Sequence, residues 1–171
     1  MPAQAGLSGE LLSLSRLFSY PETWPRAEDL DGLDPEAKEK WGQEPGPDGL
    51  EALQNQYVSL FINALPEVPC PPFGSVYLEG TIMGESTVGL KKLYAKYGLE
   101  TDEMPDLIAV ELEFLSFLAD PVAHADPEDY QALLAHLRSW TPKFLERVRQ
   151  NDESGFFKAV SCYAREMLSD S

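Results

Sequence analysis

The sequence predicts an all-α fold, a single helical bundle in which residues 1–171 form one domain. Apolar residues recur three or four positions apart in nearly every segment, as on one face of a helix. No segment shows the alternation that a half-buried strand requires. The length of 171 residues suits one ordinary domain, and 43% hydrophobic residues suffice for a core.

The first segment predicts a helix that ends before Pro21, because its apolar stripe consists of Leu7, Leu11, Leu14, Leu17 and Phe18. Residues 22–47 are rich in Pro, Gly, Asp and Glu, which favours a loop. Within them we expect one short helix, with Asp34 as its N-cap and Pro35 at its first position.

The third expected helix starts at Asp48 and ends at Pro66. Asp48 and Glu51, three positions apart, resemble a capping box at its start. One face collects its apolar residues: Leu50, Leu53, Tyr57, Leu60, Phe61 and Ala64.

The stretch 69-PCPPFGSVYLEG-80 carries three prolines in its first four residues. Prolines stop the preceding helix and leave the chain little conformational entropy to lose. We therefore expect an extended connector that presents Phe73, Ser75 and Tyr77 near Asp106.

The next helix carries Leu90, Leu93, Tyr94 and Tyr97, and Gly98 suits its C-cap. Residues 106–119, DLIAVELEFLSFLA, are apolar nearly all round, which predicts a central buried helix.

Three carboxylates in this buried helix are candidates for chemistry. We expect Asp106 to cap the helix that runs from residue 107 and to hold its carboxylate at a pocket rim. Glu111 and Glu113 are two positions apart and point to different sides, so they are no acid–base pair. One of them is expected to be buried against an arginine, with Arg138, Arg147, Arg149 and Arg165 as the candidates.

Two helices complete the bundle. Asp126-Pro127 opens the first, with Tyr130, Leu133, Leu134, Leu137 and Trp140 facing inward, and Thr141-Pro142 is expected to restart the chain in a new direction. The last helix buries Phe156, Val160, Tyr163 and Met167, with Phe157, Ala164 and Leu168 beside them.

The charge excludes several classes of partner. The chain has 29 Asp and Glu residues and 13 Lys and Arg residues, which gives a net charge of −16. Nucleic acid and anionic membranes are poor partners for such a chain, whereas a basic peptide is attracted to it. Solubility alone is the plainer explanation of the excess of acidic residues. No apolar run reaches the roughly 20 residues of a membrane span. With two distant cysteines and no recognisable secretion signal, the sequence indicates a cytoplasmic protein.

No catalytic, metal or cofactor site emerges from the residues. Segment 84-GESTVGLKK-92 compares poorly with a phosphate-binding loop, because Leu90 stands where lysine is needed; we expect a helix start capped by Ser86 or Thr87. The two histidines, His124 and His136, lack metal-ligand spacing, and His136 is expected on the surface or partly buried. The pattern favours a binding protein over an enzyme.

Three segments in order resemble one known family: 57-YVSLF-61 with 71-PPFGSVYLEG-80, then 103-EMPDLIAVELEFLSFL-118, then 135-AHLRSWTPKFLERVRQ-150. The set is similar to the TorD/DmsD/NarJ family of molybdoenzyme chaperones, over about residues 7 to 168. The resemblance implies an all-helical, TorD-like chaperone domain without enzymatic activity or cofactor.

The family's role implies the partner. The chain would bind the N-terminal leader, often a twin-arginine signal peptide, or the apo form of a molybdopterin-containing catalytic subunit, and assist cofactor insertion before export or assembly. A NarJ-like chaperone for a nitrate reductase-type subunit that is not exported is the alternative. A nucleotide-dependent switch is the least favoured, since only the 84–92 segment suggests it.

The family's motifs imply the peptide-binding residues. They point to ten positions here, of which all but the last match the motifs: Tyr57, Leu60, Phe61, Pro72, Phe73, Ser75, Tyr77, Pro105, Asp106 and Leu107. Leu107 stands where many members have histidine. The plainer alternative is core packing for Tyr57, Leu60 and Phe61, and capping and packing of the next helix for Ser75 and Tyr77.

The oligomeric state stays open between a monomer and a helix-swapped dimer, with the loop before Asp48 and residues 119–127 as candidate hinges.

Overall fold

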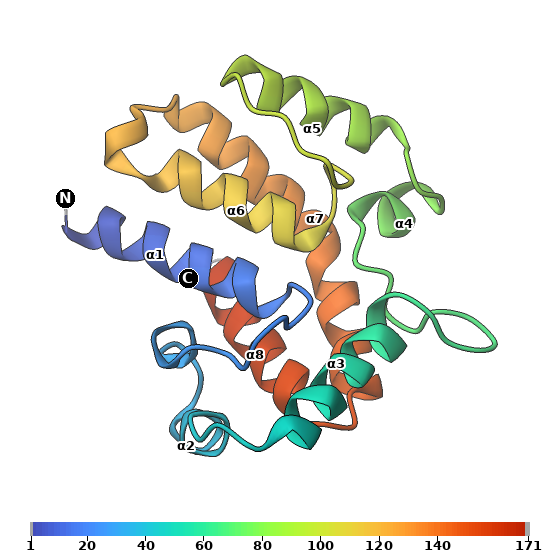
Figure 1. The fold of residues 1–171 in the computed structure, drawn as a ribbon. Helices are drawn as coiled ribbons and strands as arrows, with labels where there is room; N and C mark the ends of the chain where they lie inside the picture. The colour runs from blue at the N-terminus through green and yellow to red at the C-terminus, as the bar shows by residue number, and fades with distance from the viewer. Residues whose placement is uncertain (1, 170–171) are drawn as a thin grey trace.

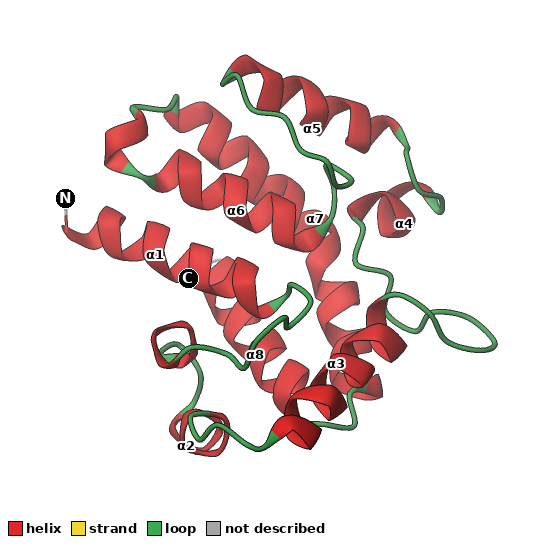
Figure 2. Cartoon of the chain, in the orientation of Figure 1, coloured by secondary structure: helices red, strands yellow, loops and turns green. Residues whose placement is uncertain are grey.

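The computed structural model describes residues 2–169, with side chains from residue 6 onward. Within this range the chain forms helices and no strand, so the all-α prediction is confirmed (Figure 2). The α-helices are α1 Pro2–Leu17, α2 Pro35–Trp41, α3 Pro47–Phe61, α4 Gly74–Glu79, α5 Glu85–Lys96, α6 Ile108–Ala119, α7 Pro127–Asn151 and α8 Phe156–Leu168. Two 3₁₀ turns, η1 Ala27–Leu30 and η2 Pro121–Ala123, lie in the connections.

The core forms where the apolar stripes of the long helices meet. Helix α1 packs along α6, α6 packs on α7, and α7 packs on α8 (Figure 1). Phe61 at the end of α3 packs on Phe144 of α7, with ring centroids 6.0 Å apart. The predicted apolar residues are buried as expected in α1, α6, α7 and α8, apart from partly buried Leu7, Phe117, Ala119, Tyr130 and Met167. The largest fully buried side chains are Phe18, Trp140, Phe144, Phe156 and Phe157. No helix in residues 2–169 is long and apolar enough to cross a bilayer.

Two predicted helix starts are confirmed in detail. The Asp34 carboxylate accepts a hydrogen bond from the Ala37 backbone N–H at 2.9 Å, and Pro35 occupies the first turn of α2. Asp126 caps α7 through the Glu128 N–H, also at 2.9 Å. These side chains satisfy backbone donors that have no partner inside the helix.

The expected bounds of the third helix are wrong at both ends. Helix α3 begins at Pro47 after Gly46, and no side-chain capping bond forms. It ends at Phe61, well before Pro66, because the Leu60 carbonyl accepts from the Cys70 N–H of the returning chain at 3.0 Å. A long-range hydrogen bond therefore ends the helix where the sequence shows no stop signal.

The expected break at Thr141-Pro142 is also wrong, since α7 continues through Pro142. Proline removes one backbone hydrogen bond and costs about 3 kcal/mol inside a helix. Trp140 and Phe144, four positions apart on either side of it, are both completely buried. Burying two large aromatic side chains on one helical face outweighs the lost bond.

Candidate peptide-binding site

The two proline-containing motifs lie side by side. Phe73 and Leu107 form an isolated antiparallel bridge. The Gly74 N–H donates to the Asp106 carbonyl at 3.0 Å, and the Ile108 N–H donates to the Pro72 carbonyl at 2.9 Å. Main-chain bonds thus clamp residues 72–74 to residues 106–108.

The connector is extended only as far as Phe73, which corrects the expectation for residues 69–80. Residues Gly74–Glu79 form helix α4 instead. Its N-cap, Phe73, has no side-chain acceptor, but the Asp106 carboxylate accepts from the Ser75 N–H at 2.8 Å. A carboxylate distant in sequence therefore supplies the cap that the local sequence lacks.

Asp106 itself lies elsewhere than predicted. It caps α4 rather than α6, whose N-cap Leu107 makes no side-chain capping bond. Its side chain is completely buried and so does not stand at a pocket rim. Asp106 acts on the site by fixing the start of α4.

Helix α4 rests on the face of α7. A Cβ atom on Gly74 would lie 2.8 Å from Nε1 of Trp140, so only glycine allows this approach. Tyr77 stacks on Trp140 with ring centroids 5.6 Å apart and 23° between the planes. The Arg147 guanidinium lies 5.1 Å from the centre of the Tyr77 ring, within the range of a cation–π interaction.

A buried polar pair lies on the same face of α7. Oε1 of Glu111 lies 3.0 Å from Nε2 of His136, and Glu111 is completely buried. Glu111 and exposed Glu113 point to different sides, as predicted, but the partner of Glu111 is a histidine and not one of the four arginines. His136 reaches Glu111 because α7 packs on α6, and His136 is partly buried, as expected.

Burial governs the protonation of this pair. It raises the pKa of Glu111 to about 7, against the opposing effect of His136. Burial lowers the pKa of His136, but the hydrogen bond and charge of Glu111 outweigh it, so the net direction is upward. The pair is therefore sensitive to pH close to neutrality.

The ten predicted site residues divide by exposure. Six are buried: Tyr57, Leu60, Phe61, Pro72, Ser75 and Asp106. Phe73, Tyr77, Pro105 and Leu107 are partly exposed. Tyr57 and Phe61 pack with Phe157 at centroid distances of 5.9 and 5.3 Å. Tyr57 and Phe61 thus belong to the core, and only the four partly exposed residues reach the surface.

Sequence reasoning missed Arg147 and Trp140 as neighbours of Tyr77. The signal was present, because His136, Trp140, Phe144 and Arg147 follow helical spacing. The expected break at Pro142 divided that pattern in two.

Other candidate chemistry is not supported by the geometry. Burial raises the pKa of the Cys70 thiol to about 12, so almost none of it is present as the reactive thiolate near neutral pH. No three metal-binding side chains cluster anywhere that the structure describes. The start of α5 is capped by Glu79, which accepts from the Ser86 N–H at 2.9 Å. This replaces the expected caps Ser86 and Thr87 and puts a carboxylate where a phosphate would have to bind.

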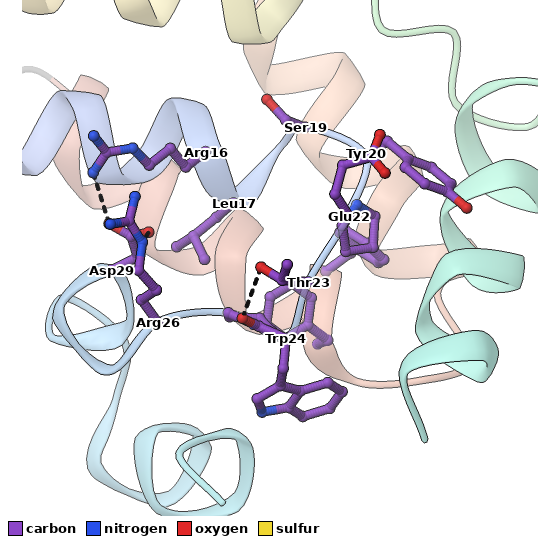
Figure 3. A pocket seen from close by; sticks show the side chains of 13 residues that line it. Arg16, Leu17, Ser19, Tyr20, Glu22, Thr23, Trp24, Arg26 and Asp29 are labelled. Atoms are coloured by element: carbon purple, nitrogen blue, oxygen red, sulfur yellow. Dashed lines mark hydrogen bonds and ion pairs between the residues drawn. The ribbon is translucent and has the colours of Figure 1, made fainter. Parts of the chain in front are cut away.

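A separate pocket of about 270 Å³ lies between the end of α1 and residues 19–26, over Phe156 and Phe157 (Figure 3). Arg16 and Arg26 both point toward Asp29, at 3.3 and 3.9 Å. Because Asp29 and Glu28 together already pair with these two cations, the pocket is a poor anion site.

Known proteins are similar to this chain in sequence and in fold. The family described as nitrate reductase delta subunit matches residues 25–146. A probable Tat proofreading chaperone DmsD of Haemophilus influenzae is 31% identical over 115 residues, covering 64% of this chain and 55% of that protein. The Tat proofreading chaperone DmsD of Salmonella typhi is 30% identical over 125 residues, covering 70% and 60%. The chain thus spans little more than half the length of these curated relatives.

The solved structures extend the likeness to the whole fold. A crystal structure described as a redox enzyme maturation protein from Archaeoglobus fulgidus matches with a TM-score of 0.70 and 31% identity, covering 97% of this chain and 94% of that one. Fold and motif pairing thus define an all-helical domain of the redox-enzyme maturation type. The chain belongs to the TorD/DmsD/NarJ family, which includes the nitrate reductase delta subunits.

Proposed function

We propose that this protein is a cytoplasmic chaperone for the catalytic subunit of a molybdopterin-containing oxidoreductase, and not an enzyme. It binds the N-terminal leader, the apo subunit, or both, and assists cofactor insertion before export or assembly. The observation that carries the proposal is the clamp between residues 72–74 and 106–108, because it joins two of the three segments on which the family resemblance rests. The chaperone names of the relatives support it.

The leader contact is proposed at the outer side of this clamp. Phe73, Tyr77, Pro105 and Leu107 offer apolar contact, and the clamp together with the Ser75–Asp106 hydrogen bond holds their backbone in place. A twin-arginine leader joins basic residues to an apolar stretch. Apolar burial contributes roughly 25 cal/mol per Å² before ordering costs, and the acidic chain attracts the basic part.

Calorimetric titration of a leader peptide from a neighbouring molybdoenzyme gene tests the proposal. We expect binding at micromolar affinity or tighter, weaker in the Asp106→Ala variant. Asp106→Asn retains an acceptor for the Ser75 N–H and serves as the matched control, with affinity close to wild type. Absence of heat with every cognate leader refutes leader binding, and an unchanged affinity in Asp106→Ala refutes the role of this site.

The family description favours one alternative client, a nitrate reductase-type subunit that is not exported. Its leader would bind without depending on two adjacent arginines. Replacing both arginines of the peptide by lysine separates the two cases, because lysine cannot reproduce the planar fork of arginine. Unchanged affinity favours the non-exported client, and a loss of at least about tenfold favours the twin-arginine leader.

The protein acts either as a monomer or as a dimer that exchanges helices about residues 119–127 or about the loop before Asp48. Light scattering of the purified chain distinguishes the two forms by mass, and co-purification from the native host identifies the client.

A further inference from the structure

Two buried carboxylates lie where α4, α6 and α7 meet. Asp106 caps α4 by accepting from the Ser75 N–H at 2.8 Å. Glu111, in the first turn of α6, lies 3.0 Å from His136 of α7. Both carboxylates are completely buried, so water screens the interaction between them only weakly. A change of charge on Glu111 therefore acts on the residue that fixes the start of α4.

Trp140 connects this cluster to the packing of α4 on α7. Its Nε1 would lie 2.8 Å from a Cβ atom on Gly74, and its ring stacks on Tyr77. The same indole also acts on Glu111. Burial dominates the pKa of Glu111 and raises it, whereas the indole N–H favours the charged carboxylate. One side chain thus contacts α4 and responds to the protonation of Glu111.

The groups that act on the pair come from α4, α5 and the segment before α6. Burial lowers the pKa of His136, but Glu111, Asp106 and Glu79 together raise it. Asp106 also raises the pKa of Glu111. On α5, burial and the two carboxylates Glu111 and Asp106 all raise the pKa of Tyr94, which therefore stays neutral near pH 7.

Helix α1, which also packs on α6, adds no charge to the cluster. Its titratable side chains are Glu10 and Arg16. Glu10 is exposed, and Arg16 pairs with Asp29 at 3.3 Å. Near pH 7 the protons gained or lost by the cluster are therefore those of Glu111 and His136.

Loss of these protons disfavours the packing of α4. As the pH rises through about 7, Glu111 becomes charged and His136 becomes neutral, which leaves a carboxylate without a cation beside Asp106. Two like charges in a region of low dielectric repel each other. Movement of α4 away from Trp140 admits water to the cluster and relieves this repulsion. Because both pKa values are raised in the folded protein, the packed arrangement is favoured at lower pH and loses that advantage as the pH rises.

We propose that Glu111 and His136 are a proton-controlled positioning pair for the clamp. The protonated pair holds α4 against α7, and proton loss releases it. Since α4 presents Phe73 and Tyr77 at the proposed leader surface, the pair regulates the affinity for the client. This inference rests on the proposed function only in naming the leader as the ligand that is regulated, because the movement of α4 belongs to the free protein.

Hydrogen exchange in the free, full-length protein is the first test. The amides of Gly74 and Ser75 are the probes, since they form the clamp bond and the cap. Their protection, corrected for the intrinsic rate, should fall at least about tenfold between pH 6 and pH 8.5. The fall should be the same at low urea concentrations, because a local opening exposes little surface. Protection that does not depend on pH, or exchange that urea accelerates as in global unfolding, overturns the proposal.

Matched variants identify the groups that titrate. Glu111→Gln should abolish the pH dependence, whereas Glu113→Gln, an exposed position on the same helix, should retain it. His136→Asn should move the transition to higher pH, because His136 favours the charged form of Glu111. His124→Asn changes the exposed histidine after η2 and should leave the midpoint in place.

The midpoint distinguishes proton control from packing alone. A merely structural role of the pair would change the protection of Gly74 and Ser75 without moving the midpoint of its pH dependence, and this result overturns the proposal. Circular dichroism confirms that each variant is folded. Should Glu111→Gln fail to fold, the shift expected in His136→Asn decides, because that side chain is only partly buried.

Leader affinity separates this inference from the proposed function. Calorimetry with the cognate leader, its N-terminus blocked, should show affinity that falls at least about threefold from pH 6 to pH 8.5 in wild type and stays constant in Glu111→Gln. Leader binding together with pH-independent exchange overturns the positioning pair and leaves the chaperone function standing. Exchange that depends on pH as expected, without binding of any leader, supports the pair and overturns the function.

Discussion

At the scale of single residues, Gly74 decides how closely α4 approaches α7. Its position against Trp140 leaves no space for a Cβ atom, whereas a Cβ atom on Gly89 in α5 would meet no other atom within 4 Å. The same residue type is therefore required at one site and merely tolerated at the other.

Gly74→Ala should lower the free energy of unfolding by about 1–3 kcal/mol, because the new methyl group displaces Trp140. Gly89→Ala is the control and should raise it by about 0.5–1 kcal/mol, since alanine favours the helix. Urea denaturation measures both. Equal effects of the two substitutions would contradict the close packing of α4 on α7.

Glu111 and His136 make stability depend on pH. The folded-state pKa of Glu111, about 7, lies above its ordinary value of 4.5, so the folded protein holds this proton more tightly. Its contribution to the free energy of unfolding is complete below pH 4.5 and is lost as pH rises through 7. The raised pKa of His136 acts in the same direction at and above pH 6.5.

Glu111→Gln should therefore reduce the loss of stability between pH 5 and pH 8 by about 1–3 kcal/mol. Glu113→Gln changes an exposed carboxylate on the same helix and controls for net charge. Urea denaturation at the two pH values gives the difference. A parallel response of the two variants would show that the buried carboxyl does not titrate in this range.

At the scale of elements, long-range contacts complete helices that the local sequence leaves open. Asp106 caps α4, Glu79 caps α5, and the chain at Cys70 ends α3. Each of these partners lies seven or more positions away in sequence, beyond the range of a local capping pattern. Helix α7 shows the converse, since buried aromatic residues hold it together across Pro142.

Glu79→Ala should loosen the first turn of α5, because the Ser86 N–H and hydroxyl both bond to this carboxylate. The expected cost is about 0.5–2 kcal/mol, together with faster amide exchange at Ser86. Glu85→Ala removes a first-turn carboxylate that makes no such capping bond and should change exchange much less. Unchanged protection at Ser86 in Glu79→Ala would refute the cap.

At the scale of the whole molecule, one continuous core joins the helices from α1 to α8. We therefore predict that residues 1–171 unfold as one domain. Circular dichroism and the fluorescence of the three tryptophans should give coincident urea transitions. Separate midpoints would indicate that α4 and α5 unfold independently of the rest.

The sequence by itself determined the helical class, the buried faces of α1, α6, α7 and α8, and the family, because helical periodicity and motif order are properties of the chain alone. It predicted that the connector would lie near Asp106, and the structure joins them. Tertiary structure alone decided that Asp106 is buried, that α4 exists, and that Glu111 meets His136. These depend on hydrogen bonds and packing between residues far apart in sequence, which no local pattern encodes.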